Sequence, residues 1–509
     1  MALTILQKNI IFNMIGQVTV SVLGFLSFKY IYSLLGDDAL GLIYFSLMLS
    51  TALTSALDMG LSRTIIREVS AHHSCSPHYV KKLTQTFSLF YLLAYGLMAF
   101  FFVLFLPTIL ESWIKLSTMN KGLASQVLYI IGVTSLLTIP KAFFSSICIG
   151  MQRMDINNSI EIFITALQQL GMILLLIVGS DVIVVAYWLA STNIFRIILY
   201  AVIVSRLLSI KHLLPRFSTE ILTRVKVYTT KMMWISLLLV IHKQLDKVLI
   251  SKFLPIGILG IYSFTYTSIS KTTLITGSVA QAVFPVFSEL EAKKEHKKLI
   301  NNYFTLQNLI VFGTIPIFAL ATFFTIPLFT FLLDAQKAKM LQLPVLLLAI
   351  SFYLNATLRM LSTYVSATGR PEYIIKSNVL ALFCVTPLTV LLIDKLGILG
   401  ATISWVAYYI IGALYLVPLV YRKEFNLSPF VWLKPVLTVI LGICLTYIPA
   451  WNASRLFFTN SLFIQLALFV LATTLYGVFA INMCGKEVRK LILDNVPYAR
   501  IVMFRCCKG

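Results

Sequence analysis

Acidic residues are scarce in this chain, which has 19 Asp and Glu against 41 Lys and Arg and a net charge of +22. Charged residues of both signs make up only 12% of the sequence, whereas 59% of the residues are hydrophobic and the mean hydropathy is +0.90. Such a composition excludes a soluble globular protein. The few charges that interrupt the apolar sequence therefore need an explanation of their own.

Common catalytic and nucleotide-binding motifs are also missing. The sequence contains no Gly-x-x-x-x-Gly-Lys-Ser/Thr loop, no His-Glu-x-x-His, no Cys-x-x-Cys and no Gly-x-Ser-x-Gly. These absences argue against direct ATP use, zinc proteolysis and serine hydrolysis. His72, His73, Cys75 and His78 have the residue types of a metal site, but their spacing fits no standard zinc pattern and favours a solvated loop. We expect no cofactor and no metal.

Cysteines that could form a disulfide framework are missing as well. The seven cysteines all fall in predicted membrane spans or on the predicted cytoplasmic side, so disulfides are not expected. Cys506 and Cys507 would be candidates for lipid attachment in a eukaryotic host, although unmodified tail cysteines are the simpler interpretation.

Long apolar runs are what the sequence has in abundance. Each is long enough to cross a bilayer as a helix, and continuous apolar runs do not fit the alternating strands of a barrel. The prediction is an all-α integral membrane protein of about fourteen spans, at 9–35, 39–61, 85–110, 124–149, 158–178, 182–206, 232–254, 258–287, 302–333, 342–368, 373–393, 397–421, 431–450 and 461–484.

The basic residues are distributed unevenly between the connections of these spans. Most of them lie on the side of the two termini, in the loops around 63–82, 206–231 and 293–298 and in the tail after 486. By the positive-inside rule both termini are cytoplasmic. The basic excess is then a signal of membrane topology, and we expect no nucleic-acid partner.

A weak internal repeat divides the chain. Lys29, Ser33 and Tyr44 recur as Lys247, Ser251 and Tyr262 at an offset of 218 residues, which is six spans. The pattern predicts two parallel six-helix repeats with two appended helices, an organisation typical of transporters. We expect an N-terminal lobe over 1–208, a cytoplasmic linker over 209–231, a C-terminal lobe over 232–424, and appended spans with a cytoplasmic tail over 425–509.

Cations outnumber anions within the predicted spans. The cations are Lys29, Lys141, Arg196, Lys243, Lys247, Lys271 and Arg359, and the anions are Asp58, Glu161 and Asp246. Structural ion pairing predicts near equality, because unpaired charge in a membrane is costly. A cavity that binds an anion explains the excess, and a diphosphate is the natural ligand for Lys and Arg.

Some of these charges have simpler interpretations. Lys141 and Arg359 lie toward the inner ends of their spans, where long side chains can reach the headgroups. Asp246 either neutralises the neighbouring Lys243 and Lys247 or titrates against them. His242, one turn before Asp246, is more typical of a hydrogen-bonded pair than of a proton relay.

Several segments, taken in order along the chain, resemble the Wzx-type O-antigen and polysaccharide flippases of the multidrug/oligosaccharidyl-lipid/polysaccharide exporter superfamily. They are L-L-G-D-D-A-L-G-L-I-Y at 34–44, L-D-M-G-L-S-R-T-I-I-R-E at 57–68, M-Q-R-M-D-I-N-N at 151–158, L-D-K-V-L-I-S-K-F-L-P at 245–255, A-V-F-P-V-F-S-E-L at 282–290 and S-A-T-G-R-P-E-Y at 366–373. The resemblance covers nearly the whole chain, although each motif is loose.

The resemblance implies an inner-membrane protein of two six-helix lobes around a V-shaped cavity. It would move an undecaprenyl-diphosphate-linked oligosaccharide to the periplasmic leaflet, without enzymatic activity, among membrane lipids and with polysaccharide polymerase or assembly proteins as partners. Motif positions that carry over are Asp246 and Lys247 in the central hairpin and Arg63 and Arg67 at the inner mouth.

The predicted site therefore combines binding and coupling residues. The binding residues are Lys29, Arg196, Lys243, Lys247, Lys271 and Arg359, and the candidate ion-coupling residues are Asp58, Glu161 and Asp246. A drug or organic-cation antiporter of the same superfamily is an alternative, but its cargo would favour acidic walls. A membrane-embedded enzyme of glycan assembly is a second alternative, which the short outer loops disfavour.

Overall fold

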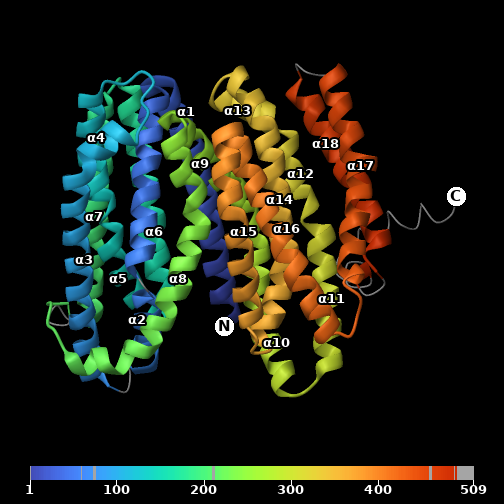
Figure 1. Ribbon diagram of the computed structural model, residues 1–509, viewed down its shortest axis with the longest axis horizontal. Coiled ribbons are helices and arrows are strands. Elements are labelled where there is room, and N and C mark those ends of the chain that lie inside the picture. Colours follow the sequence, from blue (N-terminus) through green and yellow to red (C-terminus); the bar gives the residue numbers. More distant parts are fainter. Residues whose placement is uncertain are drawn as a thin grey trace. The chain divides into compact units, whose positions relative to one another are not determined.

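A computed structural model describes residues 2–58, 60–72, 76–208, 213–457, 461–485 and 488–489. Side chains are described for these residues except 2–15, 17, 56–58, 227–228, 231–239 and 457. The chain divides into two compact units, Met1–Phe264 and Thr265–Gly509, and the division falls within helix α9. Each unit is built almost entirely of helices (Figure 1).

The described residues of unit 1 form eight helices and the first part of a ninth. They are α1 (Ala2–Asp58), α2 (Leu61–His72), α3 (Pro77–Ser112), α4 (Lys121–Ser135), α5 (Thr138–Gly150), α6 (Met154–Ile177), α7 (Val182–Leu208), α8 (Thr219–Phe253) and α9 (Ile256–Ser270).

Two breaks in unit 1 follow from single residues. Gly36 interrupts α1 with φ 82° and ψ −179°, a backbone conformation that only glycine adopts without strain. The predicted spans 9–35 and 39–61 are therefore two helical segments that meet at Gly36. The predicted span 124–149 is divided between α4 and α5, because Pro140 has no N–H to bond the carbonyl of Leu136.

The packing of unit 1 brings α1 against α4, α6 and α8, and α7 against α4, α5 and α6. Helix α9 approaches the second segment of α1 at small residues. A methyl group at Gly41 would overlap the backbone of Ile256, and one at Gly260 would meet Leu40 at 2.9 Å. Small residues at such positions let two membrane helices come close enough for backbone-level packing.

Unit 2 contains the remaining helices. They are the last part of α9, the 3₁₀ turn η2 (Lys271–Thr273), α10 (Leu274–Ala292), α11 (His296–Gly313), α12 (Ile315–Phe323), α13 (Thr325–Leu332), α14 (Ala335–Ala367), α15 (Glu372–Leu396), α16 (Ile398–Lys423), α17 (Phe430–Phe457) and α18 (Leu462–Met483). Pro316 and Pro327, both within the predicted span 302–333, lie in the first turns of α12 and α13, directly after the two breaks.

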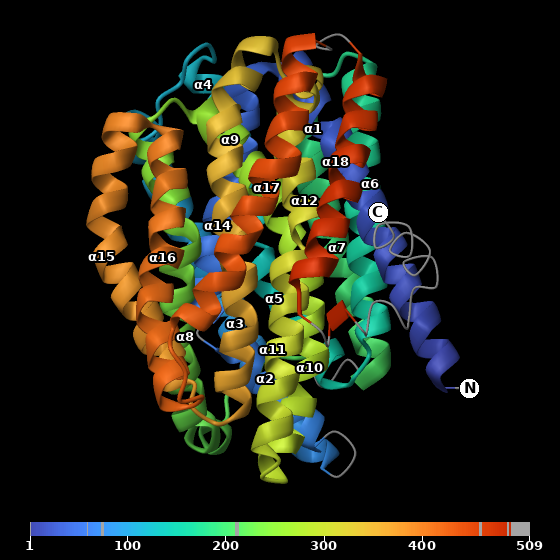
Figure 2. The same cartoon turned by 90° about the vertical axis from the view of Figure 1, so that its right-hand side faces the viewer.

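Helix α14 is the centre of unit 2 and packs against α10, α11, α12, α13 and α16. Its long row of buried residues explains this position. Helices α15 and α16 form one hairpin, and the appended pair α17 and α18 forms another (Figure 2). The hydroxyls of Tyr303 and Tyr421 lie 3.1 Å apart in the core between α11 and α16. An ion pair joins Arg370, after α14, to Glu424, after α16.

The predicted all-α membrane architecture is confirmed, but the count of fourteen spans is not. Twelve helical segments among the described residues are long and apolar enough to cross a membrane. Helix α1 contributes one segment to this count despite the break at Gly36, and α8 contributes none, since many of its side chains are not described. The predicted lobes stay a prediction, although α8 packs in unit 1 against α1, α2 and α3.

Candidate functional site

The predicted binding cations occur in both units. Unit 1 carries Lys29 on α1, Arg196 on α7, and Lys243 and Lys247 on α8. Unit 2 carries Lys271 in η2 and Arg359 on α14. Lys243 and Lys271 are exposed, Lys29, Arg196 and Arg359 are half-buried, and Lys247 is buried.

Lys247 lies in a tight polar group in unit 1. Its Nζ donates to the carbonyl oxygen of Lys243 at 2.9 Å and lies 3.4 Å from Oδ1 of Asp246. The hydroxyl of Tyr262, on α9, donates to Oδ2 of Asp246 at 2.5 Å. Asp246 and Lys247 are only 4% and 8% exposed. This arrangement matches the interpretation in which Asp246 neutralises its neighbour, and it leaves Lys243 as the exposed cation of this helix.

Glu161 forms the second charged group of unit 1. Its Oε1 accepts hydrogen bonds from Nζ of Lys141 at 3.1 Å and from the hydroxyl of Tyr200 at 2.8 Å. Tyr200 is fully buried and lies 2.9 Å from Oδ1 of Asn157, which also accepts from Ser145. The group joins α5, α6 and α7. Lys141, which the sequence placed among the excess cations, is thus compensated by Glu161.

Arg196 has a different environment on α7. Its guanidinium donates to the amide oxygens of Asn193 at 3.1 Å and Gln168 at 3.4 Å. Its Nε is buried without a hydrogen-bond partner among the described residues. A buried donor of a charged group that lacks a partner costs free energy.

Arg359 repeats this pattern in unit 2. It donates to the side-chain oxygen of Asn355 at 3.0 Å, and its Nε is also buried without a partner in the described part of the chain. Gly277 on α10 faces it, since a methyl group there would lie 3.8 Å from Nη1 of Arg359. Arg359 lies 218 residues after Lys141. These two cations, at the offset of the predicted repeat, differ because only Lys141 has a carboxylate partner among the described residues.

Aromatic rings extend from Arg359 along α14 and α16. Tyr266 on α9 lies 5.3 Å from Phe352 and 5.2 Å from Trp405, measured between ring centroids. Trp405 stacks with Tyr409, one turn further along α16, at 6.0 Å. Most of this cluster is core packing, but Tyr266 is half-buried. A cation and an exposed aromatic face in one unit are suited to a ligand that is both charged and partly apolar.

The helix α9 that carries Tyr266 is followed by an irregular turn. Lys271–Thr273 form η2, and the hydroxyls of Thr272 and Thr273 donate to backbone oxygens three residues before them. A short 3₁₀ segment within a membrane-spanning helix often marks a hinge or a functional position. Lys271 is exposed on this turn, and η2 contacts both α10 and α14.

Comparison with known proteins identifies the chain. The family model described as "Polysaccharide biosynthesis protein" matches residues 6–291, which is more than half of the sequence. The chain belongs to the polysaccharide biosynthesis protein family. A relative from Shigella flexneri, described as "Putative O-antigen transporter", is 24% identical over 416 residues, covering 80% of this chain and 96% of that protein. The predicted resemblance to the Wzx-type flippases is confirmed.

Solved structures show the same fold. "Lipid II flippase MurJ, inward closed conformation" has a TM-score of 0.68 and 16% identity, and covers 95% of this chain and 100% of that one. An inward-facing multidrug resistance MATE transporter of the MOP superfamily has a TM-score of 0.64 and 14% identity, and covers 80% and 96%. This polysaccharide biosynthesis protein is accordingly a multi-pass protein of the bacterial inner membrane.

The predicted inner-mouth arginines of this family member lie on α2, an amphipathic helix. Arg63 and Arg67 are on its exposed face, whereas Glu68 is buried. The hydroxyl of Tyr79 donates to Oε2 of Glu68 at 2.8 Å, and the guanidinium of Arg224 lies over the Tyr79 ring at 4.4 Å. Glu68 and Arg224 thus fix α2 and α8 to α3, a role that their positions in basic loops did not indicate.

Asp38 is a second residue that the sequence analysis missed. It is only 1% exposed, and its Oδ2 accepts hydrogen bonds from the backbone N–H groups of Ser117, Thr118 and Met119 at 2.7 to 2.9 Å. The loop between α3 and α4 that contains these three residues also contacts α8, since the indole N–H of Trp113 donates to the hydroxyl of Ser251 at 3.0 Å. Its position after Gly36 was the only signal of a special role.

Some predicted residues lie outside the described part. The side chain of Asp58, a candidate for ion coupling, is one of them, and so are His73, Cys75, Cys506 and Cys507. Their predicted roles remain predictions. For the other two coupling candidates, Glu161 and Asp246, the structure shows a cation and a tyrosine hydroxyl bound to each carboxylate.

Proposed function

We propose that this protein moves an undecaprenyl-diphosphate-linked oligosaccharide, the repeat unit of an O-antigen or another surface polysaccharide, from the cytoplasmic to the periplasmic leaflet. The family and its Shigella flexneri relative support polysaccharide export in general. The observation that carries the substrate class is the pair Arg196 and Arg359. Each is half-buried, bonded to neutral amides, and left with one unpartnered buried Nε among the described residues.

A diphosphate completes such groups chemically. Its oxygens accept charge-assisted hydrogen bonds from guanidinium and ammonium groups, which are about twice as strong as bonds between neutral groups. Lys29 and Lys243 supply further positive charge in unit 1, and Lys271 does so in unit 2. The half-buried ring of Tyr266 offers a flat surface to a sugar. The substrate's prenyl chain stays in the hydrocarbon of the bilayer throughout.

Transport follows from alternating access of the two lobes. The sequence has no phosphate-binding loop for ATP, so the direction of transport comes from an ion gradient or from consumption of the glycan outside. Protonation of Glu161 or Asp246 would weaken its bond to Lys141 or Lys247, which gives each carboxylate a way to report ion binding. Both termini are cytoplasmic, and a polysaccharide polymerase on the outer side takes the product.

Export of a defined glycan in a strain that lacks its own flippase tests the proposal. Arg359→Gln removes a charged hydrogen bond worth about 1.5–3 kcal/mol, so substrate affinity should fall by roughly ten- to a hundredfold. Arg359→Lys should retain part of the activity. Arg422→Gln, at the exposed end of α16, is the control. Surface glycan undiminished in Arg359→Gln, at equal abundance in the membrane, would sink the role of this arginine.

The same strain tests unit 1 and the alternatives. Lys247→Gln should abolish export, and the double change Asp246→Asn with Lys247→Gln keeps the buried pair balanced while removing the cation. Loss of a flippase leaves complete lipid-linked units in cell extracts, whereas loss of an assembly enzyme alters their length. An organic-cation antiporter would instead confer efflux of ethidium without any effect on glycan.

A further inference from the structure

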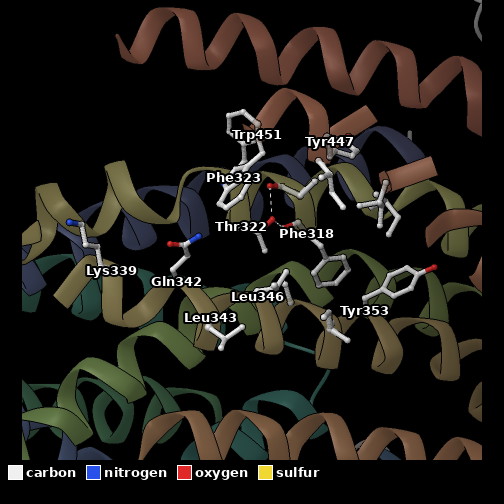
Figure 3. A pocket seen from close by; sticks show the side chains of 16 residues that line it. Phe318, Thr322, Phe323, Lys339, Gln342, Leu343, Leu346, Tyr353, Tyr447 and Trp451 are labelled. Carbon is white, nitrogen blue, oxygen red and sulfur yellow. Dashed lines mark hydrogen bonds between the residues drawn. The ribbon is translucent and has the colours of Figure 1, made fainter. Parts of the chain in front are cut away.

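A large apolar cavity lies in unit 2, and its lining contains none of the charged residues that the transport proposal uses. It has a volume of about 510 Å³, within the range of roughly 300–1,000 Å³ that is usual for ligand pockets. Its walls come from α12, α14 and the appended helix α17 (Figure 3). Arg359 lies outside its lining, since α14 presents Leu346, Ala349 and Ile350 to the cavity.

The middle of the cavity is hydrophobic. Phe318 and Phe323 line it from α12, and Ile443 and Tyr447 line it from α17. The polar groups of the wall are already bonded within the protein. The hydroxyl of Thr322 donates to the carbonyl oxygen of Ala319 at 3.0 Å, as part of its own helix. The hydroxyl of Tyr353 donates to the backbone oxygen of Val311 at 3.1 Å. A polar ligand would find few partners here.

One end of the cavity differs from the rest. Lys339 and Gln342, in the first turns of α14, and Trp451, near the end of α17, lie in its lining (Figure 3). The guanidinium of Arg455 lies over the Trp451 ring, 4.8 Å from its centroid. An apolar cavity therefore has two basic side chains at this end, one on each of two helices.

Neither Lys339 nor Arg455 forms an ion pair with a carboxylate of the described residues. Lys337, on the same turn of α14 as Lys339, lies 4.0 Å from the carboxylate of Asp334. Among the described residues, no carboxylate lies within ion-pair distance of Lys339 or Arg455, and both side chains are exposed. A tryptophan beside an arginine is also typical of the level of the lipid headgroups.

We propose that this cavity is a binding site for an anionic phospholipid. One acyl chain fills the apolar part, and the phosphate lies between Lys339 and Arg455. The cavity walls belong to candidate membrane spans, so the chain enters directly from the bilayer. Because the predicted topology places the start of α14 and the end of α17 outside, the lipid comes from the outer leaflet. The bound lipid joins the appended hairpin to α12 and α14, a role separate from the proposed transport.

Lipid binding to the purified full-length protein, measured by native mass spectrometry, tests the proposal. The probes are phosphatidylglycerol and phosphatidylcholine with identical acyl chains. At about 1 kcal/mol for each basic residue near an anionic headgroup, Lys339→Gln and Arg455→Gln should each reduce phosphatidylglycerol binding roughly fivefold. Lys434→Gln, exposed at the other end of α17, is the control and should change nothing.

A pair of matched variants tests the acyl-chain part. Ala319→Phe places a ring inside the cavity and should reduce binding of both phospholipids, whereas Leu320→Phe places the same ring on an exposed position outside the lining. Equal binding of the two phospholipids to the wild type overturns the headgroup assignment, and unchanged binding in Ala319→Phe overturns the cavity. Preferential binding of undecaprenyl phosphate over phosphatidylglycerol assigns the cavity to the substrate chain and also refutes the proposal.

Discussion

Replacing Asp38 by alanine should strongly destabilise unit 1 at its predicted outer side. The Oδ2 atom of Asp38 accepts three backbone N–H groups, from Ser117 at 2.8 Å, Thr118 at 2.7 Å and Met119 at 2.9 Å. Each orphaned buried donor costs about 1–3 kcal/mol, but some regain water from the surface. We therefore expect a loss of about 4 kcal/mol for Asp38→Ala.

Asparagine at the same position separates the geometry from the charge. Asp38→Asn keeps one acceptor oxygen for the loop and loses only the charge assistance, so the expected loss is about 1–2 kcal/mol. Thermal unfolding of the purified full-length protein, followed by fluorescence-detected size exclusion, ranks the stabilities of the wild type, Asp38→Asn and Asp38→Ala. Asp394→Ala, an exposed acid in the α15–α16 turn, is the control and should behave as wild type.

A second measurement tests whether Asp38→Ala loosens the loop that contains Ser117. A cysteine introduced at Ser117 should react faster with a membrane-impermeant maleimide in the Asp38→Ala background than in the wild type, because its backbone has lost its anchor. Equal melting temperatures for Asp38→Ala and Asp394→Ala, together with unchanged labelling, would refute the assignment of Asp38 as the anchor of this loop.

Three further predictions concern charge, packing and topology. Glu161→Gln leaves Lys141 without its carboxylate partner and should lower the free energy of unfolding by about 2 kcal/mol. The double variant Glu161→Gln with Lys141→Met should recover most of this loss. Loss of transport at unchanged stability in Glu161→Gln would instead favour a role in ion coupling. Gly41→Val should destabilise strongly in the same unfolding assay, because Ile256 occupies the space, whereas Gly96→Val, which faces open space, should not. A cysteine at Lys297 should be protected from the impermeant maleimide in intact cells; labelling there would reverse the predicted orientation.

Much of the architecture follows from local properties of the sequence. Apolar runs of sufficient length form helices in a membrane because no other open structure satisfies the backbone. The positions of several breaks follow equally, since Gly36 adopts a positive φ and Pro140, Pro316 and Pro327 lack an amide hydrogen. The ordered motifs also predicted the family, which the match over 6–291 confirms.

The candidate site required the structure, because a charge on a helix does not reveal its partner. Lys141 and Arg359 are separated by the 218-residue offset of the predicted repeat, yet only Lys141 meets a carboxylate among the described residues. The contacts of Asp246 with Tyr262 and of Asp38 with the loop after α3 join residues far apart in the chain. The sequence showed that cations outnumber anions within the predicted spans, and the tertiary structure decided which of the described cations meet a carboxylate. The physical reason is that ion pairing depends on distances across helices, which helical periodicity does not specify.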